Sequence, residues 1–193
     1  YKLQLELLKQ FATECYMPIT YGGGIDNLKD AETILKLGFE KICFTSLFLK
    51  NQKIIEDISK NFGKQSIVIK LDLKKNLFGK LKIFDHVKKK TISLEINEAI
   101  KQAISTGAGE IVLNFIDNEG TRSGLSKNDF KNIDFNISAP LILSGGINSY
   151  DNIKDVFEEN IDAVAVGSLF VYFGVHKAVL ISYPNLEEKE KIV

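Results

Sequence analysis

Several residue types are scarce in this chain. Its 193 residues include no tryptophan, two cysteines, two histidines and three prolines. With so few thiols and imidazoles, neither Cys15 nor Cys43 has the spacing of neighbours that a zinc site needs, so we expect no bound metal. Both cysteines fall beside or inside expected core elements, and we expect them to be buried free thiols rather than a disulfide.

The chain also lacks an excess of charge. Its 25 basic and 25 acidic side chains give a formal net charge of zero, which argues against a nucleic-acid partner. No apolar run approaches the roughly 18 residues of a membrane span, so we expect no membrane contact and a soluble, cytoplasmic protein. The composition, 45% hydrophobic and 26% charged, is typical of one globular domain, residues 1–193.

The first residue is Tyr1, not methionine. It lies inside a helical pattern of apolar residues, Leu3, Leu7, Leu8 and Phe11. A natural start would show methionine and an entry into structure, so we expect the domain to be incomplete at its N-terminus.

One segment of the chain occurs twice. Residues 18–48 align without a gap on residues 140–170, at a constant offset of 122 positions. Each copy predicts a strand, a glycine turn, an amphipathic helix and a second strand. In the first copy Asp26 or Asn27 can cap the helix and Gly38 can end it. In the second copy Ser149 and Asn160 take these places.

The second strands of the two copies, residues 42–44 and 163–166, are almost entirely apolar. This pattern is typical of strands buried on both faces of a parallel sheet. Over the whole chain, apolar segments predict six strands, near Ile19, Ile42, 67–71, 111–113, 141–143 and 164–166. Helical patterns separate them, at 54–62 before Gly63, 96–104 before Gly107, and more briefly at 127–133 and 175–181.

Alternating strands and helices are typical of either an open doubly wound sheet or a closed barrel of eight units. The internal repeat favours an α/β fold of the (β/α)8 TIM-barrel type. In a closed ring of eight units, a rotation by four units places one copy of the repeat on the other. About six units are visible. Residues 74–93 partly alternate around a turn and predict a small inserted hairpin, on which His86 would be a surface residue.

The two copies offer matching sites for anions. Gly22, Gly23 and Gly24 follow one strand, and Ser144, Gly145 and Gly146 follow its counterpart. The next strand of each copy ends in a second small-residue turn, Thr45–Ser46 in one and Gly167–Ser168 in the other. Glycine lets the backbone turn sharply and bring its N–H groups to a phosphate. Two such pockets indicate a ligand with phosphates at both ends, or one phosphate and a relic second site.

Polar residues also follow the central strands. Asp72 ends the third strand, where a carboxylate can act as a general acid or base, although it could instead pair with Lys74. Asn114 ends the next strand and precedes a polar loop at 117–124. In this loop Thr121 and Ser123 could donate to a phosphate, or the loop could be ordinary surface.

Four of these motifs together resemble a known family. They are 21–25 (Tyr-Gly-Gly-Gly-Ile), 107–111 (Gly-Ala-Gly-Glu-Ile), 117–124 (Asp-x-x-Gly-Thr-x-Ser-Gly) and 144–146 (Ser-Gly-Gly). In this order they resemble the cyclase (synthase) subunit of imidazole glycerol phosphate synthase. The resemblance runs from Tyr1 to about Tyr183 and includes the inserted hairpin.

The resemblance implies a barrel without cofactor that partners a glutaminase subunit. Ammonia from the glutaminase would attack a bisphosphorylated ribulosyl precursor, giving imidazole glycerol phosphate and an aminoimidazole carboxamide ribotide. It also implies that Asp72 is one of two catalytic aspartates, the other lying before Tyr1. The resemblance carries phosphate contacts over to Gly24, Ser46, Gly120, Gly146, Gly167 and Ser168. From the loops and strand ends described above, the expected site also includes Thr45, Asn114, Thr121, Ser144 and Gly145.

The chain departs from that family where Asn114–Phe115 replaces Thr-Ser and Thr45–Ser46 replaces Asn-Thr. We expect Phe115 to face the ligand. A paralogous branch resembles the chain still better, sharing the turn at 77–80 and the tail at 169–184. It is linked to surface-polysaccharide (lipopolysaccharide) biosynthesis, where glutaminase-derived ammonia would convert an acetamido sugar into an acetamidino sugar. A non-catalytic scaffold for the glutaminase, or an ammonia-independent sugar isomerase of histidine synthesis, are the remaining alternatives.

Overall fold

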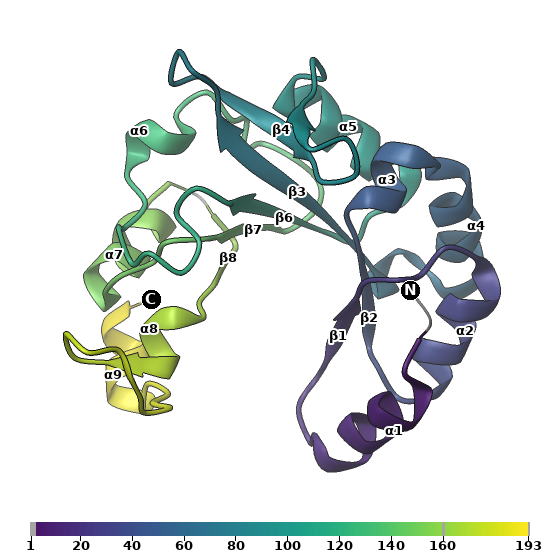
Figure 1. Cartoon of the computed structure of the whole chain (residues 1–193), viewed down its shortest axis with the longest axis horizontal. Coiled ribbons are helices and arrows are strands. Elements are labelled where there is room, and N and C mark those ends of the chain that lie inside the picture. The colour runs from purple at the N-terminus through teal and green to yellow at the C-terminus, as the bar shows by residue number, and fades with distance from the viewer. Residues whose placement is uncertain (1–2, 160, 193) are drawn as a thin grey trace.

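The computed structural model describes residues 3–159 and 161–192. Its main sheet contains the parallel strands β1 (Thr20–Gly22), β2 (Lys41–Phe44), β3 (Ile67–Lys75), β6 (Glu110–Phe115), β7 (Leu141–Ser144) and β8 (Ala163–Ala165). They lie side by side in chain order, and the sheet curls into an open half-barrel (Figure 1). A doubly wound sheet would reverse its strand order at one point, whereas a barrel keeps it. The predicted barrel-type arrangement is confirmed for these strands.

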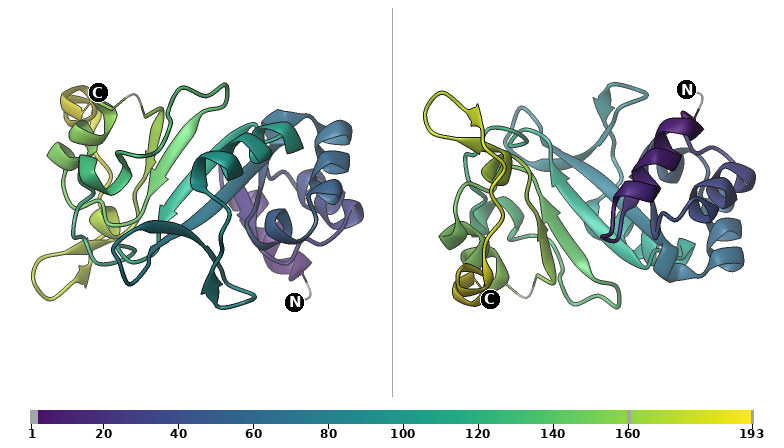
Figure 2. Two further views of the ribbon diagram at one scale, coloured as in Figure 1. Left: turned by 90° about the horizontal axis from the view of Figure 1, so that it is seen from above. Right: turned by 90° about the horizontal axis from the view of Figure 1, so that it is seen from below.

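The main helices between the strands lie on the convex side of the sheet (Figure 2). They are α2 (Leu28–Lys36), α4 (Gln52–Phe62), α5 (Ile96–Thr106) and α7 (Tyr150–Phe157), with the shorter α6 (Lys127–Phe130) beside α7. Short helices also follow β2 and β8 directly, namely α3 (Ser46–Lys50) and α8 (Ser168–Val171), and α1 (Leu5–Glu14) precedes β1. Phe48, Ile34 and Ile69 are among the fully buried side chains between helices and sheet. In the described ranges no helix has the length and apolar character to cross a membrane.

The helix ends predicted from the sequence are largely confirmed. Asn27 caps α2 by accepting a hydrogen bond from the backbone N–H of Asp30, and Ser149 caps α7 in the same way. α4 and α5 end at Gly63 and Gly107, whose φ angles of 86° and 103° suit glycine. Asn160, the predicted end of α7, lies outside the described residues.

The predicted hairpin after the third visible strand is also confirmed. β3 continues past the sheet and returns as β4 (Leu81–Asp85), which pairs with it antiparallel, and β5 (Lys90–Thr91) adds to β4. The side chain of Asn76 closes the turn by accepting from the backbone N–H groups of Phe78 and Lys80. The hairpin thus folds back beside the carboxyl end of β3, the strand that carries Asp72.

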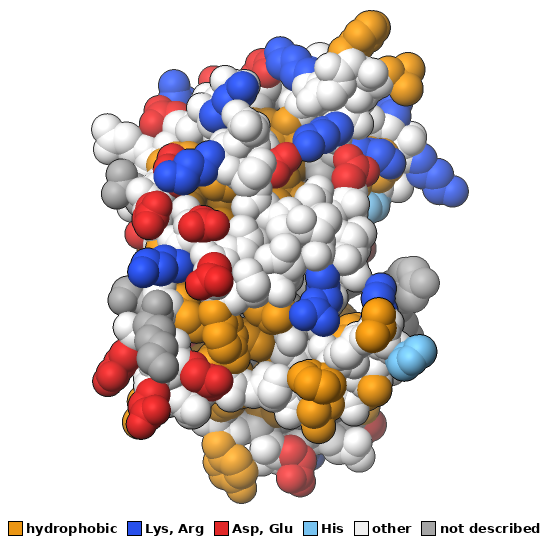
Figure 3. Space-filling model, turned by 90° about the vertical axis from the view of Figure 1, so that its left-hand side faces the viewer, with side chains coloured by type: hydrophobic (Ala, Val, Ile, Leu, Met, Phe, Trp, Pro, Cys, Tyr) orange, Lys and Arg blue, Asp and Glu red, His pale blue; other side chains and the backbone are white. Residues whose placement is uncertain are grey.

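The helix predicted at residues 175–181 is wrong. This segment forms the return of a hairpin, in which β9 (Tyr172–Phe173) pairs with β10 (Ala178–Val179). Gly174 and Lys177 both have positive φ, which breaks a right-handed helix and closes the turn instead. A further helix, α9 (Leu186–Ile192), follows. Hydrophobic side chains of this end of the chain stand exposed among charged ones on the face shown in Figure 3.

Two predictions about burial are wrong. The second strands of the two copies, β2 and β8, are not buried on both faces. In β2, Ile42 and Phe44 are buried against the helices, whereas Lys41 and Cys43 are half-buried on the opposite face. The concave side of an open sheet has no helix layer to cover it, so burial alternates as in a half-solvated sheet. Cys15 caps the end of α1 and is exposed, not buried.

Candidate active site

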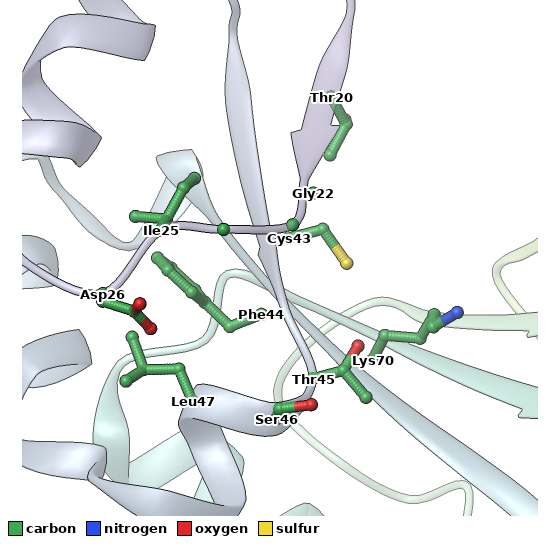
Figure 4. Close-up of a pocket in the computed structure, with 12 residues that line it drawn as sticks. Thr20, Gly22, Ile25, Asp26, Cys43, Phe44, Thr45, Ser46, Leu47 and Lys70 are labelled. Carbon is green, nitrogen blue, oxygen red and sulfur yellow. The ribbon is translucent and has the colours of Figure 1, made fainter. Parts of the chain in front are cut away.

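The two half-sites of the first repeat lie together around one cavity. A cavity of about 540 Å³, cavity 1, is lined by Gly22–Gly24 from the turn after β1 and by Thr45 and Ser46 from the end of β2. Lys70 of β3 joins them. In Figure 4 the side chains of Thr20, Cys43 and Lys70 extend to one side of the strands, whereas Ile25, Phe44 and Leu47 extend to the other.

The second repeat forms a matching cavity. Cavity 2, of about 650 Å³, is lined by Ser144–Gly146 after β7, by Gly167 and Ser168 after β8, and by Gly120 from the polar loop. Arg122 and Lys177 add positive charge to its lining, and Glu119 adds negative charge. Each predicted pair of half-sites is therefore brought together by the fold.

Two glycines of cavity 2 are required by the backbone. Gly145 and Gly146 have φ angles of 100° and 87°. A Cβ atom on Gly145 would lie 2.5 Å from the carbonyl oxygen of Phe115, and one on Gly146 would lie 2.7 Å from the Cβ of Asn118. Any side chain here would collide, so the turn brings its backbone to the cavity only with glycine.

Thr121 and Phe115 do not line these cavities. The hydroxyl of Thr121 donates to the backbone oxygen of Asn118 at 2.6 Å within its own loop. Phe115 does not face either cavity, contrary to expectation; it is 2% exposed and packs edge-to-face on Phe130 at a ring separation of 6.5 Å. Neighbouring residues of a strand point to opposite faces, so Asn114 on the concave side puts Phe115 in the core.

Asp72 lies at the centre of a polar cluster between the cavities. It is 2% exposed, and β3 and β6 place it directly opposite Asn114, which in turn lies opposite Ser144 of β7. Asn114 Nδ2 donates to Asp72 Oδ1 at 2.8 Å, and Lys70 Nζ lies 3.3 Å from the same oxygen. His86 Nε2 lies 2.8 Å from Asp72 Oδ2. These contacts compensate a buried carboxylate, which alone would be costly.

The position of His86 depends on the turn after β4. Asp85 is buried, and its Oδ1 accepts from the backbone N–H groups of Val87 and Lys88 at 2.9 and 3.0 Å. The hydrogen bond from Lys88 is the main cause that holds the pKa of Asp85 below its usual value. Phe84 packs edge-to-face on the imidazole at a ring separation of 4.9 Å. The half-exposed His86 is thereby held against Asp72.

Lys70 and His86 were missed as candidate site residues. His86 is exposed, as expected of a surface residue, but its Nε2 also contacts the buried carboxylate. The signal for Lys70 was present in the sequence: it is the charged residue in the apolar run 67–71 and lies two positions before Asp72, hence on the same face of β3. No local signal for His86 exists, because its contact depends on how the hairpin folds back.

The polar cluster touches both cavities. Lys70 lines cavity 1 and pairs with Asp72. Asn114 Nδ2 lies 3.4 Å from Glu119 Oε2, and Glu119 lines cavity 2. A ligand with an anionic group in each cavity would pass over Asp72. Among the described residues, no group of three or more His, Cys, Asp or Glu side chains is arranged to hold a metal ion.

Cys43 also lines cavity 1, and its thiol is held mainly in the protonated form. Burial raises the pKa of its thiol to about 11, although the charge of Lys70 opposes this rise. At pH 8 about one such thiol in a thousand is ionised, and only the thiolate reacts.

We therefore expect iodoacetamide at pH 8 to modify the exposed Cys15 first and Cys43 at least about tenfold more slowly. Mass spectrometry of the digested protein at successive times measures both rates. In urea, where burial is lost, the two rates should converge. Equally fast labelling of both thiols in the folded protein would contradict this account of cavity 1.

Comparison with known proteins gives a consistent match. The family described as "Histidine biosynthesis protein" matches residues 2–177. Relatives include a protein of Vibrio vulnificus provisionally named imidazole glycerol phosphate synthase subunit hisF3, 45% identical over 96% of this chain and 72% of its own length. A subunit of Pseudomonas aeruginosa provisionally named hisF2 is 40% identical, over 95% of this chain and 73% of its own length. The imidazole glycerol phosphate synthase subunit HisF of Helicobacter hepaticus is 33% identical, over 94% and 72%.

Proposed function

This chain belongs to the histidine biosynthesis protein family and is a homologue of the HisF subunit of imidazole glycerol phosphate synthase. We propose that it is the ammonia-using synthase subunit of a glutamine-dependent amidotransferase. A glutaminase subunit supplies the ammonia. The ammonia attacks a bisphosphorylated ribulosyl precursor. The products of the reaction are imidazole glycerol phosphate and an aminoimidazole carboxamide ribotide. The arrangement that carries the proposal is a buried carboxylate, Asp72, between two glycine-lined cavities.

The roles of the residues follow from their positions. One terminal phosphate binds in cavity 1, against the backbone after β1 and the hydroxyls of Thr45 and Ser46. The other binds in cavity 2, where Arg122 and Lys177 supply opposite charge. With both ends fixed, the reacting part of the ligand lies over Asp72, which can take up and return a proton. Asn114 holds one oxygen of that carboxylate and His86 faces the other.

A paralogous activity is the second candidate. The relatives with the numbered names hisF3 and hisF2 are 45% and 40% identical to this chain, compared with 33% for HisF of Helicobacter hepaticus. The turn at 77–80 and the tail at 169–184 resemble a branch in which the ammonia would convert an acetamido sugar into an acetamidino sugar. The diphosphate of a nucleotide sugar could occupy the same cavities. Both candidates share the ammonia donor and the position of Asp72, and they differ in the substrate.

Turnover with a defined nitrogen source tests the proposal. The chain is supplied with the ribulosyl precursor, or with a nucleotide-linked acetamido sugar, and products are separated by chromatography. We expect an ammonium salt alone to support turnover, and glutamine to support it only when the glutaminase subunit is added. Conversion of a phosphorylated sugar without any nitrogen source would instead identify an isomerase. If neither substrate reacts with either nitrogen source, the proposal fails.

A further inference from the structure

Lys70 occupies an unusual position for a charged residue. It lies in the middle of β3, between Ile69 and Leu71, which are 0% and 1% exposed. Its own side chain, 34% exposed, points to the concave face. Lysine is seldom placed within a buried strand unless an anion compensates its charge. The position of Lys70 in β3 therefore calls for an anion that compensates its charge.

Lys70 has access to two different anion sites. Its Nζ lies 3.3 Å from Asp72 Oδ1, and its side chain lines cavity 1 beside the glycine turn and Ser46. Within the described part of the chain, Lys70 supplies the positive charge in the lining of this cavity, and Asp26 adds a negative one. Without Lys70, the described residues lining cavity 1 would offer a phosphate backbone dipoles, hydroxyls and the carboxylate of Asp26, but no cationic side chain.

Asp72 does not depend on Lys70 alone. Asn114 and His86 contact its two oxygens at 2.8 Å each, whereas the Lys70 contact is longer at 3.3 Å. A lysine ammonium sits on a flexible four-carbon stem with three rotatable donors, so it can change partners at little cost. The carboxylate would keep two close contacts after Lys70 turned away.

We propose that Lys70 is a shared cation, paired with Asp72 when cavity 1 is empty and with an anionic phosphate when cavity 1 is filled. This inference rests on the phosphate ligand proposed above. Filling cavity 1 then withdraws the ammonium from Asp72 Oδ1, which keeps its hydrogen bond from Asn114 but has a second lone pair open to accept a proton from the substrate. The carboxylate becomes available as a base only when the ligand is in place, because the same lysine serves both sites.

The test is a titration with inorganic phosphate, followed residue by residue in 1H–15N spectra. Amide signals of Gly24 and Ser46 report on cavity 1, and those of Gly146 and Ser168 report on cavity 2. We expect Lys70→Met to weaken phosphate binding at the cavity 1 signals about tenfold or more, because a charge-assisted contact is lost. Cavity 2 signals serve as the internal control and should change by less than about twofold, since distant sites act independently. Lys70→Arg, which keeps the charge, should retain binding within about threefold.

The competition itself is tested at Asp72. If the carboxylate and the phosphate share one lysine, Asp72→Asn should tighten phosphate binding in cavity 1 by about threefold or more, and this gain should be largely lost in the Lys70→Met background. Unchanged cavity 1 affinity in Lys70→Met, or weaker binding in Asp72→Asn, would overturn the inference. Binding at neither cavity would overturn both the inference and the proposed phosphate ligand. Because no turnover is measured, a failure of the ammonia chemistry leaves this test unaffected.

Discussion

Asp72→Asn is expected to lower kcat of the ammonium-dependent reaction by about 10²–10⁴-fold, the usual contribution of a positioned acid or base. Asparagine keeps the shape of the side chain but removes both its charge and its ability to take up a proton. The loss should appear mainly in kcat, because the two cavities proposed to bind the ends of the ligand remain in place. Steady-state kinetics with an ammonium salt as nitrogen source measures it without involving the glutaminase.

A matched change of the same chemistry separates this loss from a general effect on folding. Asp134→Asn alters an exposed aspartate between α6 and β7, whose Oδ1 accepts from the backbone N–H of Asn136, and it should leave kcat unchanged within about twofold. Thermal unfolding of both variants shows whether either has lost its fold. Full activity in Asp72→Asn would show that Asp72 is not the acid or base of the reaction.

Gly145→Ala is expected to reduce the free energy of unfolding by about 3 kcal/mol, the sum of backbone strain at positive φ and overpacking. The new Cβ would lie 2.5 Å from the backbone oxygen of Phe115, which is fixed in β6 and in the core. The turn after β7 must therefore move, and phosphate binding at cavity 2 should be lost with it. Urea unfolding gives the stability, and the cavity 2 amide signals give the binding.

Gly167→Ala is the control from the same cavity. Gly167 has a φ of −112°, and a Cβ there would meet no atom within 4 Å, so we expect a change of at most about 0.5 kcal/mol. The two glycines follow neighbouring strands and line one cavity, but only one is required by the backbone. Equal losses of stability in the two variants would show that the close approach to Phe115 is not the cause.

Local features were predicted well from the sequence. The caps at Asn27 and Ser149 and the helix ends at Gly63 and Gly107 depend on a few adjacent residues, whose geometry is nearly independent of the rest of the fold. The paired half-sites of the cavities followed from the repeat, because two copies of one strand-turn-helix-strand unit must place corresponding turns alike.

What could not be predicted depends on contacts between distant segments. The His86–Asp72 contact requires both the register of β4 on β3 and the turn held by Asp85. The C-terminal hairpin was mistaken for a helix because its apolar residues also fit a helical period, and the positive φ of Lys177 has no signature in the sequence. Burial on one side of β2 depends on whether a second layer covers the concave face.

The likeness of the two repeats has a consequence for the direction in which a ligand lies. Two equivalent cavities would accept an elongated bisphosphate equally well either way round, and half of the bound molecules would present the wrong atoms to Asp72. The cavities here are unequal: one is served by Lys70 of the central sheet, the other by Arg122 and Lys177 of peripheral loops. His86 stands at Asp72 through the hairpin inserted after β3, which lies outside the two aligned copies. Residues outside the two copies thus make the two ends of the site different, so that the two ends of a ligand would be told apart.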